Sequence, residues 1–272
     1  MTTALDERPI GVFDSGLGGL TVARAIRAVL PQERLLYLGD TARVPYGTRS
    51  SRTIMRYARV CARHLANDDI KVLVVACNTV SAVALDMLRV ELDVPVLGVI
   101  VPGASAGVKA TQSGKLGVIA TRGTIGSGAY VRAVAAIDPR VEVVPQPAPL
   151  FVPLAEEGWT TGDVPEKVAR AYLEPLGEAG IDALVLGCTH YPLLRDVIQK
   201  VGDEVCGTLA IADSADATAD ELARLLRERN LEHRGDGALE IRVTDQPARF
   251  EEVAGRFLGA DIDELDVRQV DL

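Results

Sequence analysis

The stretch VLVVACNT, residues 72–79, decides the fold class of this chain, and ALVLGCTH, residues 183–190, repeats its pattern. In each stretch a continuous apolar run leads into a cysteine and then into small polar residues that open a helix-period segment. Continuous apolar runs of this length are typical of strands that are buried on both faces of a parallel sheet. Cys77 and Cys188 are 111 positions apart, about the size of one small domain, which indicates a duplicated α/β unit.

Similar apolar runs alternate with helix-period segments along the rest of the chain, and this alternation predicts α/β layers. Strands are expected at residues 10–13, 35–38, 72–76, 96–99, 116–120, 141–144, 183–186, 208–212, 239–243 and 265–270. Helices are expected at residues 20–30, 52–66, 80–92, 125–137, 164–179 and 217–228. About ten strands are more than one compact parallel sheet usually holds. We therefore predict two α/β domains, with the clearest break at the turn formed by residues 101–103.

Composition sets limits on the class of protein. The chain has 272 residues, 48% of them apolar, which is enough for a sizeable core. Its formal net charge of −9 gives no electrostatic footprint for nucleic acid, so no nucleic-acid partner is expected. The N-terminal residues lack the pattern of a signal peptide, and no apolar run reaches the length of a membrane span. We therefore predict a soluble, cytoplasmic protein with no membrane contact.

The four cysteines divide into two pairs by context. Without an export signal a disulfide framework is not expected. Cys61 and Cys206 lie in ordinary apolar segments and are interpreted as core residues. Cys77 and Cys188 follow strands, at the sheet edge where open α/β folds bind ligands. Each also opens a helix, whose N-terminus is expected to lower the thiol pKa and to offer N–H groups to a carboxylate.

Several chemistries use cysteine, and the pattern favours one of them. Zinc needs three or four ligands, but only Cys188 and His190 are close in sequence. Thioredoxin-type redox chemistry needs a Cys-x-x-Cys motif, which is absent. A Cys77 or Cys188 nucleophile with His190 as base remains open, but it does not explain two matched turns. Inverting a carbon requires removal of a proton from one face and return of one to the other, and two like groups in mirrored positions supply this.

Cofactor chemistry based on pyridoxal phosphate is not favoured. It needs a lysine at the active site, and none of the lysines lies in a polar turn at the end of a strand. They are Lys71, Lys109, Lys115, Lys167 and Lys200.

Two glycine-containing turns and one acidic pair contain further candidate site residues. Asp14 ends an apolar run and precedes a turn with glycines at 16, 18 and 19, which matches neither a dinucleotide nor a Walker A motif. These glycines either allow a small anion to approach the backbone or form a tight β–α turn. Asp14 would assist a base or cap the helix. Tyr46 would wall a pocket or lie in an ordinary turn, and Glu156 would act in the site or at a solvated helix end.

Several motifs in one order resemble the glutamate racemase family of cofactor-independent enzymes. The resembling segments are residues 12–16, 39–47, 76–79, 98–103, 120–121, 186–194 and 213–214. The resemblance implies two pseudo-symmetric α/β domains with mostly parallel sheets and an active site in the cleft between them. It implies a first domain of residues 1–98 plus 207–272, which carries Cys77, and a second domain of residues 99–206, which carries Cys188.

The resemblance also implies a function. The protein would be an isomerase that interconverts L- and D-glutamate without a cofactor or a metal, as a homodimer, and would supply D-glutamate for peptidoglycan in the cell wall. Cys77 would deprotonate D-glutamate and Cys188 would deprotonate L-glutamate, assisted by Asp14, His190 and Glu156. The residues implied to hold the substrate are Asp14, Ser15, Tyr46, Gly47, Asn78, Thr79, Thr189 and His190.

Two alternatives stay open at this point. One is racemisation of aspartate or of another small acidic amino acid, because the depth of the pocket that sets substrate length cannot be obtained from the sequence. The other is an interaction role, since some glutamate racemases inhibit DNA gyrase; the acidic charge and the absence of a basic motif give it no support.

Overall fold

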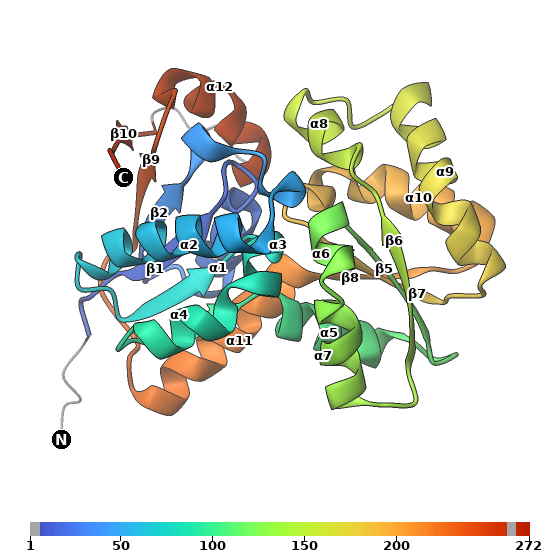
Figure 1. Ribbon diagram of the computed structural model, residues 1–272, viewed down its shortest axis with the longest axis horizontal. Coiled ribbons are helices and arrows are strands. Elements are labelled where there is room, and N and C mark those ends of the chain that lie inside the picture. Colours follow the sequence, from blue (N-terminus) through green and yellow to red (C-terminus); the bar gives the residue numbers. More distant parts are fainter. Residues whose placement is uncertain (1–5, 260–264) are drawn as a thin grey trace.

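The computed structural model describes residues 6–259 and 265–272, and it contains two parallel sheets that lie side by side with helices on their faces (Figure 1). The strand order is β10-β9-β2-β1-β3-β4 in the six-stranded sheet and β6-β5-β7-β8 in the four-stranded sheet. All the paired strands in both sheets run parallel. The predicted fold class is confirmed. The six-stranded sheet with its helices is called the first unit, and the four-stranded sheet with its helices the second unit.

The first unit uses both ends of the chain. Its strands are β1 (Ile10–Asp14), β2 (Arg34–Gly39), β3 (Val72–Val75), β4 (Val96–Gly98), β9 (Ala238–Val243) and β10 (Val267–Gln269). Its helices are α1 (Leu20–Val29), α2 (Ser51–Ala66), α3 (Asn78–Val83), α4 (Leu85–Glu91), α11 (Ser214–Arg229) and α12 (Pro247–Leu258). Two short 3-10 turns, η1 (Thr41–Arg43) and η2 (Tyr46–Thr48), follow β2.

The second unit is formed by the middle of the chain. Its strands are β5 (Lys115–Ala120), β6 (Glu142–Pro147), β7 (Ala183–Gly187) and β8 (Ala210–Asp213). Its helical elements are α5 (Ile100–Ala110), α6 (Arg122–Gly126), α7 (Ala129–Ile137), α8 (Phe151–Glu156), α9 (Asp163–Glu178), η3 (Tyr191–Leu194) and α10 (Arg195–Cys206).

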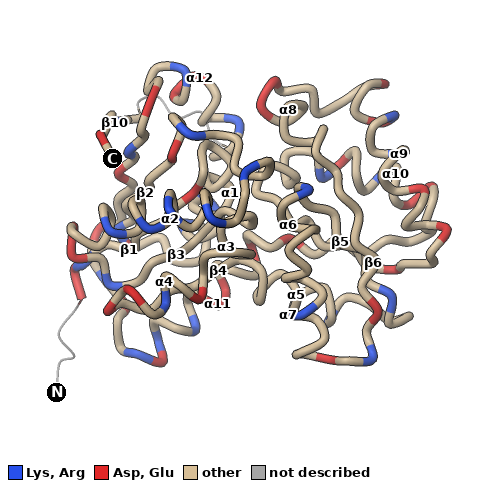
Figure 2. Tube along the Cα trace, viewed as in Figure 1, with Lys and Arg blue, Asp and Glu red and all other residues tan. Residues whose placement is uncertain are grey.

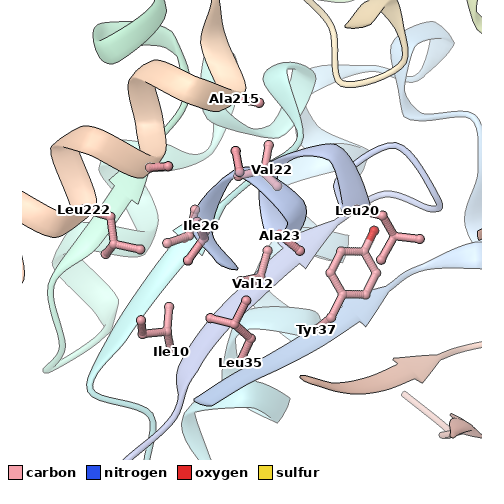
Figure 3. Close-up of a cluster of buried hydrophobic side chains, with 14 of the residues drawn as sticks. Ile10, Val12, Leu20, Val22, Ala23, Ile26, Leu35, Tyr37, Ala215 and Leu222 are labelled. Carbon is pink, nitrogen blue, oxygen red and sulfur yellow. The ribbon is translucent and has the colours of Figure 1, made fainter. Parts of the chain in front are cut away.

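The strands of the first unit are continuous apolar runs because both faces of the sheet are covered. Val12 of β1 and Leu35 of β2 point into one core with α1 and α11, and Figure 3 shows these side chains in the same cluster as Tyr37. Phe13 and Leu73 point into the other core, against α2, α3 and α4. All five residues of β1 are buried, so this central strand fixes the position of Asp14 at its end.

Two expected helices and one expected turn differ from the structure by more than their end residues. The helix expected at residues 80–92 is divided into α3 and α4, and the helix expected at residues 125–137 into α6 and α7. The second division falls at Gly128, whose φ of 67° ends a right-handed helix. The turn expected at residues 101–103 is the start of α5, where Pro102 is tolerated because first-turn N–H groups have no partner within the helix. All ten expected strands overlap an observed strand.

The expected domain boundary at residue 207 needs a correction. That boundary assigns β8 to the first domain, but β8 pairs with β7 in the four-stranded sheet. The chain returns to the first unit with α11, whose Ala219 and Leu222 lie in the core beside β1 and β2. A short strand carries no sequence signal for the sheet that it joins, which explains the error.

A buried ion pair lies at the amino-terminal end of β3, in the first unit. The Nζ of Lys71 is 2.6 Å from Oε2 of Glu33, and both side chains are almost fully buried. Lys71 also donates to the backbone carbonyls of Asp6 and Leu231. The pair therefore ties the chain before β1 and the segment after α11 to the base of the sheet.

Charged residues of both signs are spread over both units in Figure 2. No helix in the part of the chain that the structure describes is both long and apolar enough to cross a membrane.

Candidate active site

The turns that follow strands of one unit contact the turns that follow strands of the other. The Oγ1 of Thr21, at the start of α1, donates to the backbone carbonyl of Thr189 after β7, at 2.9 Å. The hydroxyl of Thr79, after β3, is 3.1 Å from that of Thr121, after β5. The polar residues at the carboxyl ends of both sheets therefore form one shared site.

Cys77 follows β3 and is the N-cap residue of α3. Its Sγ donates to the Ser15 hydroxyl at 3.4 Å, and the residue is only 6% exposed. Burial and the nearby negative charge of Asp14 raise the pKa of the Cys77 thiol to about 12, although Ser15 and the N–H of Val80 act to lower it. The expectation of a lowered pKa is wrong for Cys77, because loss of hydration outweighs the helix N-terminus.

Asp14 lies at the end of β1 and is completely buried. Its Oδ2 accepts a hydrogen bond from the N–H of Gly16 at 2.8 Å, while Oδ1 has no hydrogen-bond partner within the described residues. Burial raises the pKa of Asp14, and the charge of His190 and the nearby backbone N–H groups oppose this. The N-cap of α1 is Gly19, with no side-chain hydrogen bond, so Asp14 does not cap the helix.

Cys188 begins a chain of three side chains in the second unit. Its Sγ is 3.8 Å from Nδ1 of His190, and Nε2 of His190 is 3.0 Å from Oε1 of Glu156 at the end of α8. Burial, which alone lowers the pKa of an imidazole, is outweighed here by Cys188 and Glu156, so the pKa of His190 is raised to about 10. The 3-10 turn η3 begins at Tyr191, has Pro192 in its first turn and leads directly into α10, so the helix expected after Cys188 begins three residues beyond it.

The glycine-rich turn after β1 packs directly against the second unit. A Cβ placed on Gly18 would overlap the Thr189 hydroxyl and would lie 2.5 Å from Nδ1 of His190. The space that the sequence suggested for a small anion at this glycine is thus filled by protein. Gly47 makes a similar approach, because a Cβ there would lie 3.1 Å from Cβ of Thr121. These glycines allow the two units to meet closely.

Polar groups from both units surround the cysteine turns. The hydroxyls of Thr79, Thr121 and Thr124 lie within 3.2 Å of one another. Oδ1 of Asn78 accepts a hydrogen bond from the Tyr130 hydroxyl at 2.7 Å. The buried Nδ2 of Asn78 has no partner within the described residues, so this donor is available to a bound anion.

Tyr46 has a structural role. The residue is 2% exposed, and its hydroxyl donates to the carboxylate of Asp40. Asp40 also accepts from Arg43 and from Thr244, after β9. Because this network occupies the Tyr46 hydroxyl, Tyr46 braces the turn that carries Gly47 to the domain contact.

The sequence predicted many of these residues, but it did not predict the residues of one unit that contact site residues of the opposite unit. Cys77, Cys188, Asp14, Ser15, Asn78, Thr79, Thr189, His190 and Glu156 all lie in the shared site. Thr21, Tyr130 and the α12 residue Phe257, whose ring meets that of His190, were missed. No local motif marks them, because each faces a partner far away in the sequence.

The site is closed to solvent in this structure. Cys77 and Cys188 are each 6% exposed. A pocket of about 340 Å³ lies between α12, η1 and the end of α8; neither cysteine lines it, whereas Glu156 does. The two thiols are therefore largely shielded from solvent when the two units are arranged in this way.

A buried thiol at the end of a matching strand in each unit is the arrangement that the sequence predicted for an amino-acid racemase, which is an isomerase. The family model described as Asp/Glu/Hydantoin racemase matches residues 20–222. The chain belongs to this family, and the resemblance seen in the sequence is confirmed.

Individual relatives can be aligned with nearly the whole of this chain. The glutamate racemase of Geobacter metallireducens is 52% identical over 268 residues, which cover 97% of each chain. That of Chlorobaculum tepidum is 45% identical, with 96% of each chain covered. Among solved structures, glutamate racemase from Francisella tularensis in complex with D-glutamate has a TM-score of 0.90 at 38% identity and 98% coverage of each chain. Glutamate racemase from Thermus thermophilus has a TM-score of 0.87 at 44% identity and 99% coverage of each chain.

Proposed function

We propose that this protein interconverts L- and D-glutamate by proton transfer between Cys77 and Cys188, without a cofactor. The observation that carries the proposal is the pair of buried thiols at matched strand ends. Cys188 is close enough for its charge to raise the pKa of the Cys77 thiol. Glutamate as substrate is supported by the relatives named above, one of which was solved with D-glutamate.

The surroundings of the two thiols differ and suggest their starting protonation states. With a pKa of about 10, His190 is an imidazolium at neutral pH, held between Cys188 and Glu156. This cation lies beside the thiol that we propose as the base for L-glutamate, with Nδ1 of His190 3.8 Å from Sγ of Cys188. With a pKa of about 12, Cys77 stays a thiol. The resting enzyme is thus prepared for L-glutamate: the Cys188 thiolate takes the α-proton, and Cys77 gives its proton to the opposite face of the carbanion.

The proton balance of that step prepares the reverse reaction. After D-glutamate forms, Cys188 carries the abstracted proton and Cys77 is the thiolate. Cys77 can then deprotonate D-glutamate, while Cys188 returns its proton to the other face. In this scheme burial and the charge of Asp14 raise the pKa of Cys77, so the thiolate that forms there is a strong base for the return step from D-glutamate.

The remaining polar groups are suited to hold glutamate. The free Nδ2 of Asn78 and the hydroxyls of Thr79 and Thr121 offer donors to a carboxylate. The free Oδ1 of Asp14 offers an acceptor to the ammonium group. Ser15, Tyr46, Gly47, Thr189 and His190 complete the proposed binding set. Donors fixed around the substrate carboxylate stabilise the charge that develops when the α-proton leaves, and exclusion of water strengthens them.

Racemisation in D₂O tests the proposal. The protein, incubated with L-glutamate and no added cofactor, should incorporate deuterium at the α-carbon and yield D-glutamate. The Cys77→Ser and Cys188→Ser variants should each lose about 10²- to 10⁴-fold in rate. Cys206→Ser, a half-buried cysteine on α10, is the matched control and should keep wild-type activity. Folded protein without exchange or inversion would exclude the activity, and a fully active Cys77 or Cys188 variant would remove that thiol from the mechanism.

We also propose the cellular setting implied by the resemblance: a cytoplasmic homodimer that supplies D-glutamate for peptidoglycan. Growth of a D-glutamate auxotroph on the cloned gene tests the supply, and sedimentation tests the dimer. Aspartate is the nearest competing substrate, and kcat/KM measured for both amino acids decides between them.

A further inference from the structure

Helix α12 belongs to the first unit but reaches the Cys188–His190–Glu156 chain of the second unit. Nη1 of Arg256 donates to the backbone carbonyl of Glu156 at 2.7 Å. The next residue, Phe257, packs the edge of its ring against that of His190, with centroids 5.3 Å apart at 85°. Two successive residues of one helix therefore touch two successive members of the proposed proton-transfer chain.

The end of α8 is built to receive the Arg256 guanidinium. Glu156 is the last residue of α8, and the final carbonyls of a helix have no N–H partner within that helix. An arginine at this end satisfies a free carbonyl and interacts favourably with the helix dipole. Gly158 has a φ of 74°, and a Cβ there would lie 3.2 Å from Cζ of Arg256. A glycine at this position leaves room for the guanidinium against the turn.

The Glu156 side chain needs such support. It is 44% exposed, and its carboxylate contacts a single atom of the site, Nε2 of His190. A half-exposed glutamate loses substantial rotamer freedom when it is held in one position. Anchoring its backbone from the facing unit reduces the number of positions that its carboxylate can adopt. Because Arg256 and Glu156 lie in different units, this anchor exists only when the units are closed.

We propose that Arg256 is a positioning residue that holds Glu156 against His190 across the cleft, and so links closure of the two units to the charge of the Cys188–His190 pair. The inference rests on the proposed function, in which Cys188 is a proton-transfer thiol. Arg256 touches neither substrate nor thiol, and it acts through Glu156. In the open protein Glu156 is released, His190 loses a stabilising charge, and Cys188 becomes a poorer base until the substrate is enclosed.

Variants of Arg256 test the proposal with a control on the same helix. Arg256→Ala should lower kcat/KM by about 5- to 10-fold, the cost of about one typical hydrogen bond. Arg256→Lys, which keeps a cation near the carbonyl, should restore most of this loss. Arg249→Ala removes another exposed arginine of α12 and should change kcat/KM less than about twofold. An Arg256→Ala enzyme with wild-type kcat/KM would overturn the proposal.

Two further measurements separate positioning from a loss of stability. In Arg256→Ala the alkaline limb of the pH profile should move to lower pH, because a weaker hold by Glu156 lowers the pKa of His190. In a Glu156→Gln background Arg256→Ala should have no additional effect, since the charge that Arg256 positions is already gone. An unchanged alkaline limb, or a full additional loss in the Glu156→Gln background, would show that Arg256 acts only on folding and would overturn the proposal.

The effect of Arg256 on the pKa of His190 can also be measured without any substrate. NMR titration of the three histidines of the chain should show a lower pKa for His190 in Arg256→Ala than in the wild-type protein, while His64 and His233 are unchanged. This titration tests the link between Arg256 and His190 even if glutamate is not the substrate. An unchanged His190 titration would overturn the link, whereas failure of the D₂O experiment would overturn only the proposed reaction.

Discussion

Replacement of Gly18 by alanine should disable the enzyme without unfolding it. The backbone of Gly18 has no positive φ, so alanine can adopt its conformation. The added Cβ would overlap the hydroxyl of Thr189 and would lie 2.5 Å from Nδ1 of His190. The threonine can rotate, but the imidazole is held by Cys188, Glu156 and the ring of Phe257. The strain must therefore be relieved by separation of the two units.

The size of the effect follows from the geometry. Ordinary van der Waals contact requires 3.4–4 Å, so the His190 ring has to retreat by about 1 Å. A displacement of about 1 Å in a group that acts on a reacting proton costs about 10²-fold in rate. Because the two units can part without exposing either core, the free energy of unfolding should change by less than about 1 kcal/mol.

Racemisation followed by circular dichroism, together with urea unfolding, measures both quantities. Gly126→Ala is the matched control, since a Cβ at this exposed end of α6 meets no atom within 4 Å. That variant should keep full activity and should gain up to about 1 kcal/mol in stability. Wild-type kcat/KM in Gly18→Ala would refute the close packing of the glycine turn against His190. Loss of activity with an equal loss of folded protein would refute the separation of the two effects.

Three further outcomes are expected. Lys71→Met should lower the free energy of unfolding in urea by about 3–5 kcal/mol, because it leaves Glu33 as a buried charge without its partner; adding Glu33→Gln should restore part of the loss. The pKa of His190 is raised from 6.5 to about 10, so its contribution to stability is complete below about pH 6.5 and is lost as pH rises through 10. Urea unfolding between pH 6 and 10 should therefore show a smaller decline in His190→Asn than in the wild type. Tyr130→Phe removes the donor to Oδ1 of Asn78 and should lower kcat/KM by about tenfold, while Tm falls by only a few degrees.

The sequence predicted the residues that follow strands well, because strand and turn are local signals. Cys77, Cys188 and Asp14 each end a buried apolar run, and His190 follows Cys188 at once. Their environment was harder to predict. The pKa of Cys77 is raised, not lowered, because the depth of burial and the charge of Asp14 depend on packing between distant segments.

No local sequence pattern marks the residues that make contacts between the two units. Arg256 lies 100 positions from Glu156, and Tyr130 lies 52 from Asn78. An arginine on an exposed helix face and a tyrosine on a mostly apolar helix are common in any α/β protein. Only the assembled fold shows which residues they meet. The division of the expected helix at residues 125–137 depends on Gly128, since a glycine within a helical pattern is compatible with either a continued or an ended helix.

The pairing of β2 with β9 also has a consequence for biosynthesis. Arg34 pairs with Ala238, so a strand made early must wait for about 200 further residues before its outer edge is covered. At the usual rate of about 5–20 residues per second, the wait lasts about 10–40 s on the ribosome. The four-stranded sheet, complete at Asp213, can form during that interval. We expect the nascent chain to fold its middle first, with the β2 edge open to chaperones or to faulty pairing until translation nears its end.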